Sequence, residues 1–526
     1  MATLSLPQER PRSEVNPWLI AATVMLATFM EVLDTSVANV SLPHIAGSLS
    51  SGVDESTWVL TSYLVSNAIV LPLTGWLSNV FGRKRFYMAC VAIFTLSSFL
   101  CGLAPSLGAL VFFRVLQGAG GGGLQPISQA ILVDSFPREK QGMAMAIYGM
   151  GVVVAPTIGP TLGGWITDNF TWRWIFFINI PVGILSILMT SLLISNPTHS
   201  IRKRLRIDYI GIAFLTVGVG FLQIVLDKGQ RDDWFGSHFI AWCTIVALIG
   251  IVGVIVWELN QKDPVIDLRL LKERNFAVAV FTMYILGFVL YGTTVLLPIL
   301  LQTLLGYTAM QSGVVLLPGG VFMMMIMPVV GFMLGKFEAR WLVVAGLLIT
   351  SSGLFMMGSH FDLQMGEKTP ILVWIVSRFG VAFLFVPINV IAFYYVAPQK
   401  TNDATGLINL ARNVGGSMGI SFVTTLLDRG AQKNQSILAA HITATNFQFQ
   451  AVIQSMIQHF MQAGQSAVQA KQLAFRMFYA TLQGQAMMLS FLRDFRIMGY
   501  VCLGMIPFMF ILKKAKPGKG HRGPAH

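Results

Sequence analysis

Charge is what this sequence most clearly lacks. Asp, Glu, Lys and Arg make up only 11% of the 526 residues, whereas 54% are hydrophobic. A soluble chain of this length needs far more polar surface, so the composition predicts an all-α polytopic membrane protein. Acidic residues are fewer than basic residues, 23 against 36. No basic stripe with interleaved aromatic residues is present, which argues against a nucleic-acid partner, so the excess of base indicates membrane topology.

Other absences exclude further classes of protein. The four cysteines are scattered singly in apolar runs, without metal-ligand spacing or pairing, and the eight histidines show no grouping with a nucleophile or with metal ligands. A metal site and a membrane enzyme are therefore not expected. No G-x-x-x-x-G-K-[ST] sequence occurs, which argues against an ATP-driven pump. The first sixteen residues lack an apolar core with a cleavage site, so we expect no signal peptide.

Long apolar runs dominate the rest of the chain. Fourteen are bounded by charges and turn residues and predict fourteen spans. They cover residues 18–43, 57–79, 86–104, 107–133, 142–166, 173–194, 208–226, 238–257, 275–301, 312–335, 341–358, 370–397, 404–427 and 493–512. Of the 36 basic residues, about 23 fall in the termini and the loops on their side, against about nine in the opposite loops. The positive-inside rule therefore predicts cytoplasmic termini.

An internal repeat divides the chain. Residues 75–102 align without gaps on residues 331–358, each a span end, a basic turn and a further span. Parallel halves of this kind are typical of transporters whose two bundles rock about a central site. We therefore predict a six-helix bundle in 1–200, two extra transmembrane helices in 201–272, and a second six-helix bundle in 273–526.

The second bundle contains one long loop, residues 428–492, on the side opposite the termini. It is rich in Gln, and Phe449, Val452, Met456 and Phe460 keep helical spacing. We predict one or two amphipathic helices, either resting on the membrane surface, which we favour, or docked on a partner.

Two acidic residues, Glu31 and Asp34, lie in the first span. Carboxyls three residues apart share a helix face, and each costs about 2.5 to 3.5 kcal/mol at mid-membrane. We predict that at least one takes up and releases protons in a wet cavity. The alternative is that both reach water at a helix end or pair with a buried base.

Basic side chains also lie within spans. Arg114 in the fourth span keeps its proton, so it can hold a carboxylate ionised; otherwise it snorkels to the outer surface. Gly120 to Gly123 favour either close helix approach or local unwinding. In the thirteenth span, Arg412 lies beside Asn409 and Asn413, and it either faces the cavity or pairs structurally at a helix end.

Uncharged polar side chains in the spans are candidates for substrate contact, near Met323 to Met327 and several Phe residues. Methionine and aromatic side chains repack around differing apolar molecules, although plain helix packing is the alternative for each. The predicted substrate-binding residues are Asn67, Gln117, Gln125, Gln129, Tyr291, Gln302, Asn389, Asn409, Arg412 and Asn413.

Several segments resemble motifs of the major facilitator superfamily. Residues 75–85, GWLSNVFGRKR, resemble its cytoplasmic loop signature, with Gly75, Gly82 and Arg83 in place but Asn79 where an acid is usual, which puts a charged latch in doubt. Residues 114–120, RVLQGAG, resemble its intramembrane arginine motif. The fifth span resembles the motif that separates drug:proton antiporters from symporters, through Gly151, Pro156, Gly159, Pro160, Gly163 and Gly164. The prolines kink this span, and we expect its glycines to form a smooth face against the other half.

Residues 33–43, 172–181 and 409–417 resemble signatures of the fourteen-span drug:proton antiporters, and the layout is most similar to EmrB-type exporters. The resemblance implies two six-helix bundles plus two extra helices. It also implies export of hydrophobic or amphiphilic drugs, driven by the proton motive force without a cofactor, across the inner membrane of a Gram-negative bacterium. An EmrA-type periplasmic adaptor and a TolC-type outer-membrane channel are the implied partners. The alternative is a proton-coupled nutrient or ion symporter of the same fold.

Overall fold

The computed structural model describes residues 16–137, 140–194, 208–261, 264–440, 442 and 446–513. Within these ranges the regular structure is helical. That is expected of apolar segments in lipid, where a helix satisfies its own backbone hydrogen bonds. The basic segment 202–206 and the predicted domain boundary at residue 200 lie outside the described residues, so the division into domains stays a prediction.

The N-terminal half consists of the helices that precede residue 194. Two of them begin at side-chain caps: Asn16 accepts from the Trp18 amide at the start of the first helix, and Ser106 accepts from the Ala109 amide. These helices are α1 (Pro17–Ser48), α2 (Val53–Ser56), α3 (Trp58–Phe81), α4 (Arg83–Gly102), α5 (Leu107–Gly121), α6 (Leu124–Ser135), α7 (Gln141–Asn169), α8 (Trp174–Phe177) and α9 (Asn179–Leu193).

The predicted fourth span is α5 followed directly by α6, and Gly122 and Gly123 between them keep right-handed helical dihedrals, so Leu107–Ser135 forms one span. The glycine run allows close approach of neighbouring helices. A Cβ at Gly120 would lie 2.6 Å from the Phe94 nitrogen of α4, and one at Gly122 would lie 2.6 Å from the Asn67 oxygen of α3. Of the two alternatives for the glycine run, the structure shows close helix approach.

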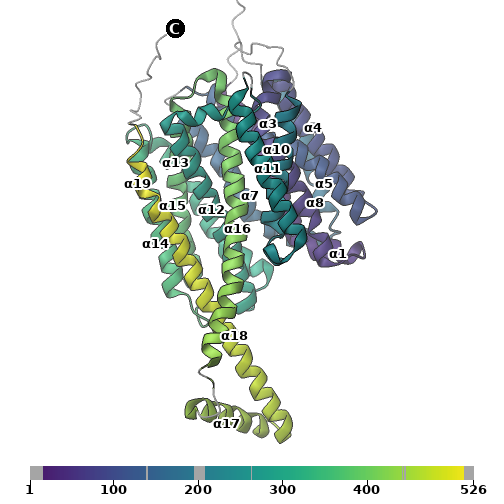
Figure 1. Cartoon of the computed structure of the whole chain (residues 1–526), viewed down its shortest axis with the longest axis vertical. Coiled ribbons are helices and arrows are strands. Elements are labelled where there is room, and N and C mark those ends of the chain that lie inside the picture. The colour runs from purple at the N-terminus through teal and green to yellow at the C-terminus, as the bar shows by residue number, and fades with distance from the viewer. Residues whose placement is uncertain are drawn as a thin grey trace, which may run out of the picture.

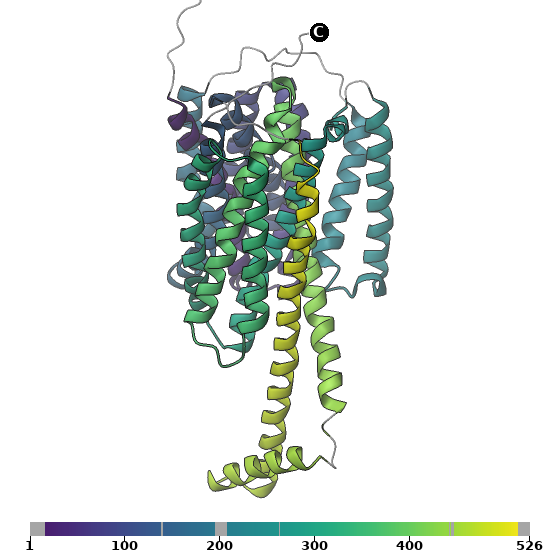
Figure 2. The same cartoon turned by 90° about the vertical axis from the view of Figure 1, so that its left-hand side faces the viewer.

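The C-terminal half follows residue 273. Its helices are α12 (Arg274–Leu304), α13 (Ala309–Met333), α14 (Ala339–His360), α15 (Lys368–Tyr394), α16 (Thr401–Ala440), α17 (Phe447–Gln462), α18 (Ala467–Gly504) and α19 (Ile506–Met509). The repeat is visible in the helix starts, because α14 begins at the residue that aligns with the first residue of α4. Helix α1 begins and α19 ends at the same end of the bundle, which we call the termini side (Figure 2).

The two halves meet most extensively along two pairs of helices. Helix α7 packs along α13, and α3 packs along α16. Equivalent glycines allow both crossings, since a Cβ at Gly331 would lie 2.9 Å from the Gly142 oxygen of α7 and one at Gly75 would overlap Asp403 of α16. The two halves are thus in close contact at the termini side.

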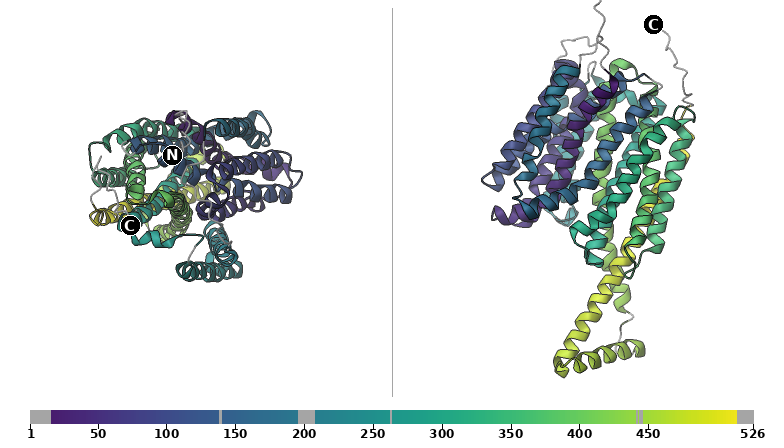
Figure 3. Two further views of the ribbon diagram at one scale, coloured as in Figure 1. Left: turned by 90° about the horizontal axis from the view of Figure 1, so that it is seen from above. Right: turned by 180° about the vertical axis from the view of Figure 1, so that it is seen from behind.

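Helices α10 (Tyr209–Lys228) and α11 (His238–Asn260) form a separate pair beside the two halves (Figure 3, left). Helix α10 touches α3 and α16. Lys228 donates to Thr57 at 2.5 Å, and Gln223 donates to Ser417 at 2.8 Å. The extra helices therefore contact both halves.

In the described residues, twelve helices are long and apolar enough to cross a membrane by length and composition. The predicted spans 404–427 and 493–512 lie on α16 and α18, which carry more polar residues and are not among the twelve. The count of fourteen stays a prediction.

The long loop, residues 428–492, is largely helical, and its position relative to the membrane stays a prediction. Helices α16 and α18 continue past the rest of the bundle as a two-helix stalk, and α17 crosses its tip (Figures 1 and 2). Asn434 donates to the Ala486 oxygen at 3.1 Å and Gln435 donates to the Tyr479 hydroxyl at 3.0 Å, which join the two stalk helices. The two stalk helices hold α17 beyond the ends of the other helices.

Candidate functional site

Asp34 lies in a buried ion pair on α1. Its carboxylate accepts from Arg114 of α5 at 2.5 Å, from Gln117 at 3.0 Å and from Asn179 of α9 at 2.8 Å. Arg114 also donates to the Val59 oxygen at 3.0 Å. Asp34 is 3% exposed and Arg114 0%, so Arg114 does not snorkel to the surface. The pair joins helices α1, α3, α5 and α9 within the N-terminal half.

The guanidinium of Arg114 also rests on aromatic rings. Its carbon lies 4.2 Å from the centroid of Tyr63 and 5.7 Å from that of Phe176. One nitrogen, Nη2, is buried without a hydrogen-bond partner. Ring faces stabilise a cation without neutralising it, so Asp34 supplies the counter-charge.

Glu31, one turn before Asp34, lies in a separate network that reaches the other half. It accepts from Tyr63 and Asn67 at 3.1 Å each and from Gln125 of α6 at 2.6 Å. The side-chain oxygen of Gln125 in turn accepts from Arg412 of α16. One neutral amide therefore connects a carboxylate of the N-terminal half to a guanidinium of the C-terminal half.

A second polar chain crosses between the halves one turn further along α6. Gln129 donates to Asn389 of α15 and accepts from Asn409 of α16 at 2.6 Å, and Tyr148 of α7 donates to Asn409 at 3.3 Å. All these bonds join uncharged groups. They hold the two halves together through groups that do not gain or lose protons near neutral pH.

At the termini side, Asn79 accepts from Asn402 of α16 at 3.0 Å, so an amide pair stands where the superfamily motif usually has an acid. Gly82 has φ of 84°, which favours glycine at the α3–α4 turn. Arg83 donates to Asp134 at 2.6 Å, near the carbonyl end of α6. The loop motif therefore joins α3 to the C-terminal half through neutral groups.

The Gly/Pro pattern of α7 packs differently from the expectation. A Cβ at Gly151, Gly159 or Gly163 would meet α1 of the same half, and one at Gly164 would have nothing within 4 Å. Gly142 and residues between the motif glycines meet the C-terminal half instead. The glycine face was assigned to the wrong neighbour because sequence spacing gives the face of a helix but not its partner. Helix α7 continues through Pro156 and Pro160.

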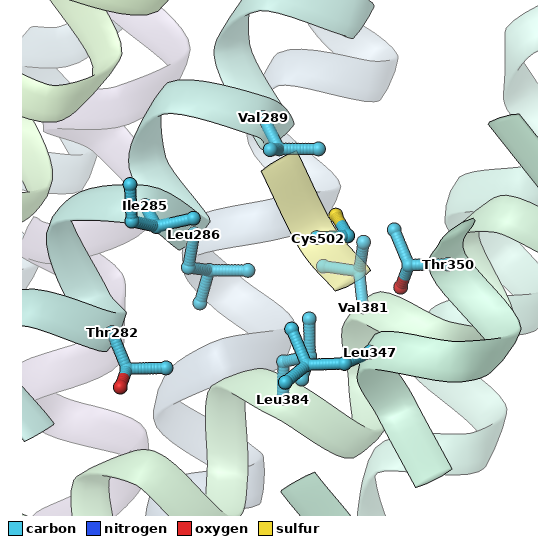
Figure 4. Close-up of a pocket in the computed structure, with 9 residues that line it drawn as sticks. All are labelled: Thr282, Ile285, Leu286, Val289, Leu347, Thr350, Val381, Leu384 and Cys502. Atoms are coloured by element: carbon cyan, nitrogen blue, oxygen red, sulfur yellow. The ribbon is translucent and has the colours of Figure 1, made fainter. Parts of the chain in front are cut away.

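The structure brings most of the predicted substrate residues together, but not all. Tyr291 is half-buried against Gly416, and Asn413 is also half-buried. Gln302 is exposed two residues before the end of α12 and joins neither network. One pocket lies inside the C-terminal half, among α12, α14, α15 and α18 (Figure 4). Its lining is aliphatic apart from Thr282, Thr350 and Cys502, and contains none of the predicted residues.

Sequence reasoning missed several residues that complete these networks. Tyr63 lies four residues before Asn67 and therefore on the same face of α3, a spacing that could have identified it. Asn179 is a lone amide in an apolar run, and Tyr148 offered no signal. In the described residues no group of three or more metal-ligating side chains occurs. The arrangement can keep two carboxylates out of contact with water and connect one of them, Glu31, to the C-terminal half.

Comparison with known proteins agrees with this arrangement. A sequence profile of the Major Facilitator Superfamily matches residues 24–420. The chain is 37% identical over 448 residues to the multidrug export protein EmrB of Escherichia coli (strain K12), an alignment that covers 85% of this chain and 87% of that protein. It is 40% identical over 448 residues to the fatty acid resistance protein FarB of Neisseria gonorrhoeae, with the same coverage.

Among solved structures, the proton:xylose symporter XylE has a TM-score of 0.61 at 15% identity, covering 96% of this chain and 97% of that one. At that identity the likeness concerns the fold alone. The helical pairing across two halves is therefore that of a known transporter fold.

Proposed function

The chain belongs to the Major Facilitator Superfamily, and on that premise we propose that it exports hydrophobic or amphiphilic drugs in exchange for protons. It is a multi-pass membrane transporter. The relatives named for multidrug export and fatty acid resistance support a cargo of this class. We further propose that it lies in a bacterial inner membrane with cytoplasmic termini, uses no cofactor beyond the proton motive force, and works with an EmrA-type adaptor and a TolC-type channel.

The observation that carries the exchange is the pair of buried carboxylates on α1. Asp34 is held by Arg114, and Glu31 is connected through Gln125 to Arg412. A proton on Asp34 removes the counter-charge of a buried guanidinium, which is unfavourable unless Arg114 is released or hydrated. A proton on Glu31 weakens the polar contact with the other half. Protonation thus changes the relative stability of the two arrangements of the halves.

Both carboxylates are 3% exposed in this conformation. Proton exchange therefore requires a second conformation in which separation of the halves admits water to α1. The energetics suffice, because one proton moving through 100 mV yields about 2.3 kcal/mol and a tenfold concentration ratio needs about 1.4 kcal/mol. One proton per drug sustains a ratio of roughly fiftyfold.

The test is drug-dependent proton flux in liposomes containing the purified protein. Asp34→Asn is expected to abolish the flux while the protein stays folded. Glu258→Gln is the matched control, because Glu258 is also buried but lies on α11, where it accepts from the Val265 amide at 2.9 Å. Unchanged flux in Asp34→Asn removes Asp34 from the mechanism. Movement of the substrate in the same direction as the protons would support the symporter alternative.

A further inference from the structure

Arg378 is a buried arginine in the middle of α15 that the two networks described above do not use. It is 3% exposed. Its guanidinium carbon lies 3.6 Å from the ring centroid of Trp374, and Nη2 donates to the hydroxyls of Thr293 at 3.0 Å and Thr294 at 3.1 Å. The stacking and the two bonds to α12 fix the plane and direction of the guanidinium.

Arg378 lacks the counter-charge that Arg114 has. Among the described residues, no carboxylate forms an ion pair with it, and its Nε is buried without a hydrogen-bond partner. Arg114, by contrast, lies 2.5 Å from Asp34. A buried guanidinium without an anion is unfavourable, and such residues inside a membrane usually mark a ligand or ion route.

The sequence explains why no anion of the described residues lies beside Arg378, since the buried Asp494 of this half is on α18 and pairs with Arg493. Residues 275–337, 368–402 and 404–427, which cover α12, α13, α15 and the spanning part of α16, contain no Asp or Glu. They do contain Arg378 and Arg412. Arg412 reaches a carboxylate of the other half through Gln125, whereas the guanidinium of Arg378 makes its polar contacts, within the described part of the chain, with hydroxyls and a ring.

A continuous row of side chains connects the central networks to Arg378. Gly416 lies one turn beyond Arg412 on α16, and a Cβ there would be 2.6 Å from the Tyr291 ring. Thr294 follows Tyr291 on the same face of α12, and its hydroxyl accepts from Arg378. Arg378 therefore contacts the face of α12 that also carries Tyr291, which lies beside α16.

We propose that Arg378 binds the anionic headgroup, a carboxylate or sulfonate, of single-chain amphiphiles that the protein exports. A guanidinium binds such a group by charge and by hydrogen bonds, and Nε is a buried donor without a hydrogen-bond partner, whereas Nη2 already donates to Thr293 and Thr294. This inference rests on the proposed export function and adds a class of cargo and a residue that selects it.

The experiment compares two cargoes of equal chain length, radiolabelled decanesulfonate and decyltrimethylammonium, accumulated by inside-out proteoliposomes under a proton gradient. Decanesulfonate stays ionised and does not carry protons through the bilayer by itself. Arg378→Gln is expected to lower accumulation of the anion at least about tenfold and to leave that of the cation unchanged. Arg378→Lys, which keeps the charge, is expected to retain more anion transport than Arg378→Gln.

Equal losses for both cargoes would show a structural role and overturn the proposal, as would no loss for either. The wild-type protein and Arg378→Gln are expected to differ in anion accumulation. If this difference disappears when phosphatidylglycerol is added to phosphatidylcholine liposomes, the occupant is a lipid headgroup and the proposal is also wrong. Failure of the proposed function looks different, because the wild-type protein then accumulates neither cargo.

A second measurement does not depend on the folding of Arg378→Gln. In the wild-type protein, 2-bromodecanoate places bromine beside its carboxylate and is expected to quench Trp374 with saturation. Trp374→Phe removes that component of the quenching. Quenching that is the same in both proteins overturns the proposal.

Discussion

The link from Gln125 to Arg412 predicts a measurable change in how the halves separate. Gln125→Leu keeps the size of the side chain but removes both of its polar bonds. The bond to Glu31 lies within the N-terminal half, whereas the bond from Arg412 crosses to the C-terminal half. Only the crossing bond changes the equilibrium between joined and separated halves.

Hydrogen bonds to charged groups contribute about 1.5 to 3 kcal/mol, so losing the crossing bond raises the ratio of separated to joined protein by roughly ten- to 150-fold. Spin labels at Phe81 and Phe337 report this ratio through their distance distribution. Both side chains are exposed, at 55% and 54%, and lie at the termini side of different halves. The four native cysteines are buried and do not compete for the label.

Ser128→Ala is the matched control. Ser128 also lies on α6, but its bonds, from Thr28 at 2.9 Å and to the Val24 oxygen at 3.3 Å, stay within the N-terminal half. We expect its distance distribution to equal that of the wild type. The reasoning is refuted if Gln125→Leu leaves the distribution unchanged, or if Ser128→Ala shifts it as much.

Three further predictions concern packing, the buried ion pair and the stalk. Gly163→Leu is expected to lower the free energy of unfolding by about 1 to 3 kcal/mol, because a Cβ there already comes within 3.1 Å of Val37. Gly164→Leu, with nothing within 4 Å, serves as its control in thermal unfolding, and equal losses would contradict the packing argument. Arg114→Lys keeps the charge but loses the guanidinium that reaches Val59, Gln117 and Asp34. Both the unfolding temperature and the drug-dependent proton flux should therefore fall. Wild-type values for both would show that the guanidinium is dispensable. Replacing α17 by a short Gly-Ser linker is expected to spare flux in liposomes yet lower drug tolerance in cells, and equal loss in both assays would indicate a purely structural stalk.

Much of the fold could be predicted because lipid imposes simple rules on a sequence. A run of apolar residues without charge must be helical, and its length follows from the bilayer thickness. Twelve of the predicted spans correspond to helices that meet this criterion. The gapless repeat also predicted the matching starts of α4 and α14.

The candidate site was predicted less completely. Glu31, Asp34 and Arg114 stand out in sequence because ionisable groups are rare in apolar runs. The sequence indicated that Arg114 can hold a carboxylate of the first span ionised, as it does with Asp34, but it did not assign Glu31 to Gln125. The i, i+3 spacing places both carboxyls on one face without identifying the neighbours of each. The contacts of Tyr148 and Arg378 join helices that lie far apart in the chain, so sequence spacing did not reveal these contacts.

By itself, the sequence determined the class of protein, the helical segments and the rare buried charges, because each is a local balance between side chains and lipid. Only the tertiary structure decided that Glu31 is connected to Arg412 through Gln125, that the glycines of α7 face α1, and that the long loop forms a stalk beyond the end of the bundle. Those features depend on the direction in which each helix face points after packing, and helical periodicity does not specify the partner of a face.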